Sequence, residues 1–482
     1  MTRIAEPTGP QLPETQPACN TEDALPTASM ADTVLLLLVL SVVQRLIGFV
    51  RASLFCRWLD PAELGRWDMS FAFLMTAGPL VVLALAGCLG RYVEYYRRRS
   101  RLRTFIRRTA SLYFGLAIVG SVVVLAAAEP LSVLIFGTAA EAATVRLLAA
   151  ALLAVTTFNY VYELAAALRN TRLAVSLQFV NSVLFALLGV GLLLGREVSA
   201  TSVIIAYGAA CSITVLPAVV WLVRNWTKLP EQSTAVAAEP NRFWRPLLFY
   251  SAWAWAAATL SNLFEVADRY MIVHFANGKP DQALALVGDY HASRLVPVLM
   301  VSVAALVGSI VTPHLSHDWE RGERERVSQR LNLLAKLFGL LLLCGGGVIL
   351  ATAPWLFGSI LGGKYGGGLA VLPLTLTYCV WFSLFLILEN YVLCCERSHL
   401  VGVSMAAGLA TNVVLNLLLL PRFGLPGAVA ATAVGNAVAL AAIMGFSYRH
   451  GLRFDKGTLL MALVPTVFLL GPIATAGAIV LL

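Results

Sequence analysis

Charged residues are scarce in this chain. Asp, Glu, Lys and Arg make up 13% of its 482 residues, whereas hydrophobic residues make up 59%. Soluble domains have about a quarter charged residues, so this composition, with a mean hydropathy of +0.79, excludes an ordinary soluble protein. Apolar stretches of about 20 residues recur, each long enough to cross a bilayer as a helix. The short alternating segments of a membrane β-barrel are absent. We predict an all-α, polytopic transmembrane fold.

Cysteines and catalytic motifs are also sparse. None of the eight Cys forms a CxxC pair or stands at metal-ligand spacing from a His, which is typical of small buried side chains and gives no metal site. The stretch LGGKYGGGL (361–369) lacks the GxxxxGK[ST] pattern of a phosphate loop, and the sequence has no HExxH. We expect no cofactor and no enzymatic activity. A membrane glycan polymerase or ligase stays open as an alternative, although it would usually need a sizeable loop domain.

The first 31 residues are rich in proline and polar side chains, without the basic and apolar regions of a signal peptide. We interpret them as a disordered cytoplasmic tail. Thirteen spans follow, and residues 224–245 form a cytoplasmic linker between the first six (32–223) and the next six (246–446). The predicted spans are 32–55, 67–90, 109–127, 146–168, 173–194, 200–223, 246–273, 285–313, 331–352, 369–393, 399–420, 426–446 and an extra span, 457–481.

The distribution of basic residues predicts the orientation. The stretch RYVEYYRRRSRLRTFIRR (91–108) follows the second span, and most of the 35 Lys and Arg fall in the tail and in loops on that same side. By the positive-inside rule this side, with the N-terminus, is cytoplasmic. Anionic lipid headgroups then explain the net charge of +9. Nucleic-acid binding has no support.

The two halves of the chain resemble each other. VNSVLFALL from Val180 and TNVVLNLLL from Thr411 share the pattern NxVLxxLL. The segment before each has a late carboxylate followed by a basic turn, with Glu163 in the first half and Glu389 in the second. An even number of spans separates the matching segments, so the repeats have parallel orientation. We predict two six-helix bundles.

Ionisable residues inside spans usually face an interior or a watery cavity. Counting along the spans places Arg45 and Arg294 near the midplane, and Arg51 and Arg269 in the outer half. Glu163 and Glu389 fall near the cytoplasmic ends of their spans. Arginine suits phosphate, because its planar guanidinium donates paired hydrogen bonds. These four arginines are therefore candidates for holding an anionic, lipid-linked substrate.

The remaining polar residues are compatible with simpler roles. Glu265 and Arg269 stand four residues apart, so they can pair on one helix face, and Asp268 can share the same arginine. That pairing leaves a role for these carboxylates in the cavity open, and gating or ion coupling is a further possibility for Glu163, Glu265, Asp268 and Glu389. His291 is expected to be solvated. Asn181, Asn412 and Asn416 favour hydrogen bonds between helices.

Three stretches carry a resemblance to a known family. RLIGFVRASLFCRWLDPAELGRW (45–67), followed by GCLGRYVEYY (87–96), resembles the opening of polysaccharide transporter family flippases. ADRYMIVHF (267–275) with VGDYHAS (287–293) resembles their seventh-to-eighth hairpin. TNVVLNLLLLPRFGLPGAVAATAVGNAV (411–438) resembles their NxxxN…PxxGxxGAxxAT pattern, which is the most specific of the three. The resemblance extends to about residue 446.

The resemblance implies a MATE-like fold of two six-helix bundles in a V, and a flippase for polyprenyl-pyrophosphate-linked oligosaccharide in the bacterial inner membrane. It implies that Arg45, Arg51, Arg269 and Arg294 engage the pyrophosphate, with membrane lipids and a polysaccharide polymerase or export machinery as partners. Family members often have twelve or fourteen spans, and thirteen departs from that pattern. A MATE-like cation or drug antiporter stays open as the transport alternative.

Overall fold

A computed structural model of the chain describes residues 30–83, 85–229 and 240–481, and every regular element in them is helical. Nine described helices are long and apolar enough to cross a membrane, and a bent pair formed by Pro61–Val81 and Leu85–Arg98 would make a tenth. The prediction of an all-α, multi-pass membrane fold is confirmed. Most of the predicted tail (1–31) and part of the predicted linker (224–245) lie outside the described residues.

The first half of the chain forms one bundle of six long elements. Its helices are α1 (Met30–Trp58), α2 (Pro61–Val81) continuing through η1 (Leu85–Cys88) into α3 (Leu89–Arg98), α4 (Leu102–Ala126), α5 (Ala128–Phe136), η2 (Ala139–Glu141), α6 (Ala142–Ala167), α7 (Thr171–Gly195), α8 (Ala200–Asn225) and η3 (Trp226–Lys228). The axis bends by 57° between α2 and the helices that follow it. Pro79 contributes to this break because it removes a backbone donor from the last turns of α2.

The second half forms the other bundle. Its helices are α9 (Pro240–Phe275), α10 (Pro280–Arg294), α11 (Pro297–Glu320), α12 (Arg324–Trp355) with η4 (Leu356–Ile360), α13 (Gly366–Cys394), α14 (Ser398–Phe423) and α15 (Leu425–Arg449). The predicted eighth span, 285–313, is thus divided between α10 and α11. Pro297 explains the division, because a proline starts a helix readily and cannot donate to the preceding turn.

The two bundles repeat one pattern of helices. In each, the second element starts at a proline, Pro61 or Pro280, and breaks part-way along its length. The turn after α6 has Arg169 in the left-handed region (φ 62°), and the turn after α13 has Glu396 there (φ 58°). A non-glycine residue at positive φ is uncommon. Its occurrence at matching turns supports the predicted internal repeat.

The C-terminal segment differs from the prediction. The predicted continuous span 457–481 is divided into α16 (Lys456–Leu463), η5 (Val464–Leu470) and α17 (Pro472–Leu481). Gly471 has a φ of 92°, which favours glycine, and Pro472 follows it, so the helix cannot continue through this point. The segment packs on α12, where the ring of Phe468 leaves no room for a side chain at Gly346.

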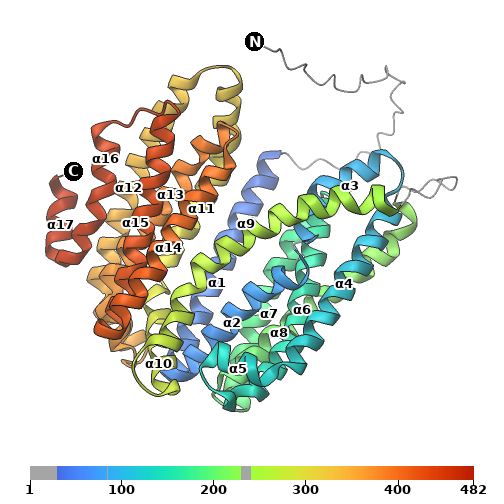
Figure 1. Ribbon diagram of the computed structural model, residues 1–482, viewed down its shortest axis with the longest axis horizontal. Helices are drawn as coiled ribbons and strands as arrows, with labels where there is room; N and C mark the ends of the chain where they lie inside the picture. The colour runs from blue at the N-terminus through green and yellow to red at the C-terminus, as the bar shows by residue number, and fades with distance from the viewer. Residues whose placement is uncertain (1–29, 84, 230–239, 482) are drawn as a thin grey trace, which may run out of the picture.

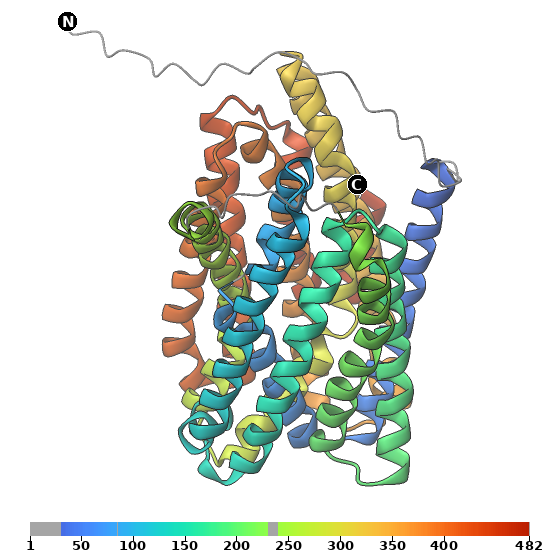
Figure 2. The same ribbon diagram turned by 90° about the vertical axis from the view of Figure 1, so that its right-hand side faces the viewer.

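The two bundles form a V (Figure 1). They diverge toward the end that contains α3 and the α11–α12 connection, here called the open end. They meet at the end that contains α5 and α10, here called the closed end. Helix α9 crosses from the first bundle toward the second, and Figure 2 shows the outer face of the first bundle. The basic stretch 91–108 spans the α3–α4 connection at the open end.

Candidate functional site

A buried ion pair joins the two halves of the chain. Arg269 of α9 places its Nε 2.8 Å from Oδ2 of Asp68 on α2, and the two side chains are only 7% and 1% exposed. His291 of α10 places its Nδ1 2.8 Å from the other oxygen of Asp68. One carboxylate of the first bundle is therefore tied to two helices of the second half.

A second buried carboxylate lies one residue before Arg269. Asp268 accepts hydrogen bonds from Nδ2 of Asn412 (2.7 Å) and Nδ2 of Asn416 (3.1 Å) on α14, and from the hydroxyl of Tyr290 (3.0 Å) on α10. The hydroxyl of Tyr378 on α13 lies 3.2 Å from that of Tyr290. The predicted interhelical role of Asn412 and Asn416 is thus what the structure shows. Asp268 is the point where α9, α10 and α14 meet.

Arg294 lines a cavity beside this network. The cavity, of about 200 Å³, is lined by α9, α10, α11, α13 and α15, and both Glu265 and Asp268 face it. The Nη2 of Arg294 lies 3.6 Å from Oε1 of Glu265, whose side chain is 59% exposed. The Nε of Arg294 is buried without a hydrogen-bond acceptor among the described residues. This Nε–H is therefore an unsatisfied buried donor beside the cavity.

Tight packing at the closed end holds these groups together. A Cβ on Gly65 of α2 would lie 1.9 Å from the carbonyl oxygen of Leu284, and one on Gly288 of α10 would lie 2.0 Å from that of Pro61. Only glycine allows two backbones to approach so closely. The α2–α10 crossing is consequently the main backbone contact between the bundles.

More exposed contacts surround this crossing. Arg66 of α2 pairs with Glu63, with Glu141 (2.9 Å) and with Asp281 of α10 (2.6 Å). At the start of α2, Lys364 from the α12–α13 connection lies 3.0 Å from Oδ1 of Asp60. Of these ion pairs, Arg66 with Asp281 and Lys364 with Asp60 link the two bundles.

The four candidate arginines do not form one cluster. Arg294 lines the cavity, and Arg269 is occupied by Asp68. Arg51 of α1 stacks over the ring of Phe185 at 4.1 Å, within the first bundle. Arg45 is half-exposed on α1. The structure thus brings Arg269 and Arg294 to one region and places Arg45 and Arg51 on another helix.

The predicted pairing of Glu265 with Arg269 is wrong. Arg269 pairs with Asp68 instead, and Glu265 pairs with Arg294. Residues four apart share a helix face, but a long arginine side chain turns toward a buried carboxylate on another helix when one is within reach. Asp268 likewise binds asparagines rather than Arg269. His291, expected to be solvated, binds Asp68.

Sequence reasoning missed Asp68, because the predicted second span starts at 67 and so places this residue at its edge. The signal was present: Pro61 marks the start of the helix, which puts Asp68 two turns inside it. Glu163 of α6 and Glu389 of α13 are half-buried near the ends of matching helices. No group of three or more His, Cys, Asp or Glu suited to a metal occurs within the described ranges.

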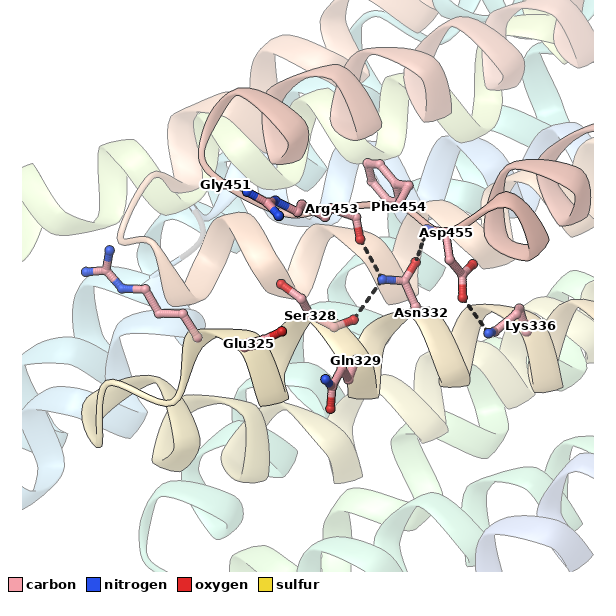
Figure 3. Close-up of a pocket in the computed structure, with 10 residues that line it drawn as sticks. Glu325, Ser328, Gln329, Asn332, Lys336, Gly451, Arg453, Phe454 and Asp455 are labelled. Carbon is pink, nitrogen blue, oxygen red and sulfur yellow. Dashed lines mark hydrogen bonds and ion pairs between the residues drawn. The ribbon is translucent and has the colours of Figure 1, made fainter.

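A larger cavity lies elsewhere, between α12 and the α15–α16 connection (Figure 3). It has a volume of about 640 Å³. Asn332 donates to the carbonyl oxygen of Arg453 (2.7 Å), and Lys336 bonds to Asp455 (2.5 Å), which lowers the pKa of that carboxyl. These contacts fasten the start of α16 to α12. The cavity lies outside the region where the two bundles meet.

Comparison with known proteins identifies the family. Residues 30–319 match the family described as polysaccharide biosynthesis protein, and this match covers more than half of the chain. The chain belongs to the polysaccharide biosynthesis protein family. The predicted resemblance to polysaccharide transporter family flippases is thereby confirmed. A search of curated proteins found no match.

Two solved structures of membrane transporters have the same fold as this chain. The lipid II flippase MurJ, in an inward closed conformation, superposes with a TM-score of 0.70 at 12% identity, over 93% of this chain and 97% of that one. A multidrug resistance MATE family transporter in an inward-facing conformation gives a TM-score of 0.61 at 14% identity, over 84% and 94% of the two chains. Because the sequence identities are so low, these similarities establish the fold alone, which is that of MurJ and of the MATE transporters.

Proposed function

We propose that this protein is a flippase that moves a polyprenyl-pyrophosphate-linked oligosaccharide across the bacterial inner membrane, for polysaccharide or lipopolysaccharide biosynthesis. Its family and its fold, shared with a lipid II flippase, support this proposal. The mechanism is alternating access, in which substrate binding shifts the population between states open to each side. A polysaccharide polymerase and export machinery would act on the delivered product.

The main observation behind the proposal is that the guanidinium of Arg294 is buried and only partly paired. Its buried Nε has no acceptor in the described part of the chain, and its carboxylate partner, Glu265, is largely exposed at 3.6 Å. Such a guanidinium is poised to bind a phosphate oxygen through a charge-assisted hydrogen bond. The cavity of about 200 Å³ is smaller than a typical pocket for a drug-sized molecule, roughly 300–1,000 Å³. It suits the phosphate group, while the glycan occupies the space between the bundles.

In this proposal the basic open end faces the cytoplasm, together with the N-terminus. The substrate enters there, on the side where it is made. Arg45 and Arg51 of α1 contribute positive charge along its path, and Arg269 contributes once its ion pair with Asp68 opens. The lipid tail stays in the bilayer.

Asp268 is the proposed site of ion coupling. Its buried carboxylate faces the same cavity as Arg294, and the side-chain oxygens of Asn416 and Asn436 lie buried without a donor among the described residues. A carboxylate with amide and hydroxyl oxygens nearby can take a proton or a small hard cation. Glu265 gates access to this cavity, while Glu163 and Glu389 act near the cytoplasmic surface.

The flippase proposal is tested by complementing a deletion strain with Arg294→Ala, Arg45→Ala and Arg294→Lys. We expect both alanine variants to abolish surface polysaccharide at normal expression, with lipid-linked repeat units accumulating inside. Lysine keeps the charge without the planar fork, so Arg294→Lys should restore only part of the export. Arg449→Ala, at an exposed position at the end of α15, is the matched control and should export normally.

Other outcomes separate the alternatives. Wild-type surface polysaccharide from both alanine variants would refute binding of the phosphate by these arginines. Export of repeat units with shortened chains would point to a polymerase. The carboxylates in the cavity, Glu265 and Asp268, favour a MATE-like cation antiporter as the second candidate. Increased drug resistance on expression, without any effect on surface glycan, would support that function.

Ion coupling is tested with the purified protein in proteoliposomes, by imposing a sodium or a pH gradient in turn. We expect the wild type to respond to one gradient and Asp268→Asn to lose that response, because the amide cannot carry the charge. Glu129→Gln, at an exposed position on α5 outside the cavity, should keep the response. An unchanged gradient response in Asp268→Asn would contradict the assignment of Asp268.

A further inference from the structure

An apolar groove runs along the outer face of the first bundle, away from the candidate site. Helices α4 and α8 each pack on α6 and have little contact with each other in the described part of the chain. Figure 2 shows this face, with α4 in light blue and α6 to α8 in turquoise to green. The space between α4 and α8 forms a groove of about 380 Å³ near the open end of the V.

The lining of the groove suits hydrocarbon. Each of the three helices contributes a small side chain to the groove, and these leave room for a hydrocarbon chain. They are Ala110 on α4, Ala165 on α6 and Ala218 on α8. The hydroxyl of Tyr160 on the wall donates a hydrogen bond to the carbonyl oxygen of Ile106 (3.4 Å). This donor is therefore already satisfied without a ligand. A ligand bound in this groove would therefore contact mostly apolar side chains.

The start of α4, next to the groove, carries basic side chains. The Nε of Arg103 on α4 donates to the carbonyl oxygen of Leu229 (2.8 Å), and the side chain also bonds to that of Thr227. These bonds tie the start of α4 to the segment after α8. Arg107, one turn further along α4, is exposed at the edge of the groove and makes no ion pair with a described residue.

We propose that this groove binds one acyl chain of an anionic phospholipid, whose phosphate contacts Arg107. Charge complementarity supports the choice of an anionic lipid, because a basic interfacial side chain next to an apolar slot attracts a negatively charged headgroup. Arg107 belongs to the basic stretch 91–108, and such basic segments lie near the headgroups of the cytoplasmic leaflet. The bound lipid fills the space between α4 and α8.

The proposal is tested by native mass spectrometry of the purified full-length protein with phosphatidylglycerol or phosphatidylethanolamine added. We expect the wild type to retain one phosphatidylglycerol molecule more strongly than phosphatidylethanolamine. Arg107→Gln should lose this preference while still binding a lipid, since the apolar slot remains. Ala110→Trp should lose the bound lipid because the indole fills the groove. Arg172→Gln, an exposed arginine on α7 outside the groove, should behave as the wild type.

Thermal melting confirms that each variant is folded, so that a loss of lipid reports on the site. Unchanged retention of phosphatidylglycerol in a folded Ala110→Trp variant would overturn the proposal. Preferential retention of polyprenyl phosphate over phosphatidylglycerol would also overturn it, by assigning the groove to an isoprenoid chain. Neither result bears on export of the glycan, so the proposed flippase function is tested separately.

Discussion

At the scale of single residues, Asp68 decides what its neighbours can do. Its carboxylate holds both Arg269 and His291, and its side chain is almost fully buried. A guanidinium with such a partner is neutralised and positioned, so Arg269 is a structural group in this state. Arg294, whose partner Glu265 is exposed, keeps the capacity to bind an anion. Two arginines that look equivalent in the sequence therefore have different roles.

Replacement of Asp68 by Asn should strongly destabilise the protein. It removes one partner of a buried pair and leaves Arg269 charged, which typically costs about 3–5 kcal/mol. Thermal melting of the purified protein measures the effect. Asp281→Asn removes an exposed partner of Arg66 and should cost at most about 1 kcal/mol. Equal melting temperatures for the two variants would contradict the importance of the buried pair, whereas Asp68→Asn with Arg269→Gln should recover part of the loss.

At the scale of helices, breaks and crossings position the site. The break between α10 and α11 places Arg294 at the end of a helix, where its side chain reaches the cavity. The crossing of α2 and α10 brings Asp68 to His291, and the packing of α2 on α9 brings it to Arg269. Both features come from residues with special backbone properties, Pro297 at the break and Gly65 with Gly288 at the crossing. The position of the site thus depends on where the helices end and where their backbones contact each other.

Gly65→Ala should separate α2 from α10. The added Cβ would lie 1.9 Å from the carbonyl oxygen of Leu284, and backbone cannot move aside as a flexible side chain can. Overpacking of this kind typically costs about 1–3 kcal/mol, measured as a lower melting temperature and a loss of export. Gly78→Ala on the same helix is the control, since no atom beyond its own stretch of helix lies within 4 Å of its added Cβ. A wild-type melting temperature for Gly65→Ala would show that the crossing is looser than described.

At the scale of the whole molecule, the V is held shut at one end by interactions of two kinds. Breaking exposed pairs such as Arg66 with Asp281 and Lys364 with Asp60 costs little free energy, because water replaces each partner. The buried pair of Asp68 with Arg269 is expensive to open unless another ion takes the place of one partner. Under the proposed function, a phosphate-bearing substrate that reaches Arg269 supplies that ion. Opening of the closed end would then depend on the presence of substrate, as transport requires.

The sequence by itself determined the class of the protein, because hydrophobic composition and segment length fix which parts of a chain can cross a bilayer. It also predicted the two repeats and the family, since NxVLxxLL and the proline- and glycine-rich stretch 411–438 are local patterns. Only the tertiary structure decided the partners of each charge. The pairing of Arg269 with Asp68 joins residues far apart in the chain, and the packing of α2 on α9 selects it over the nearby Glu265.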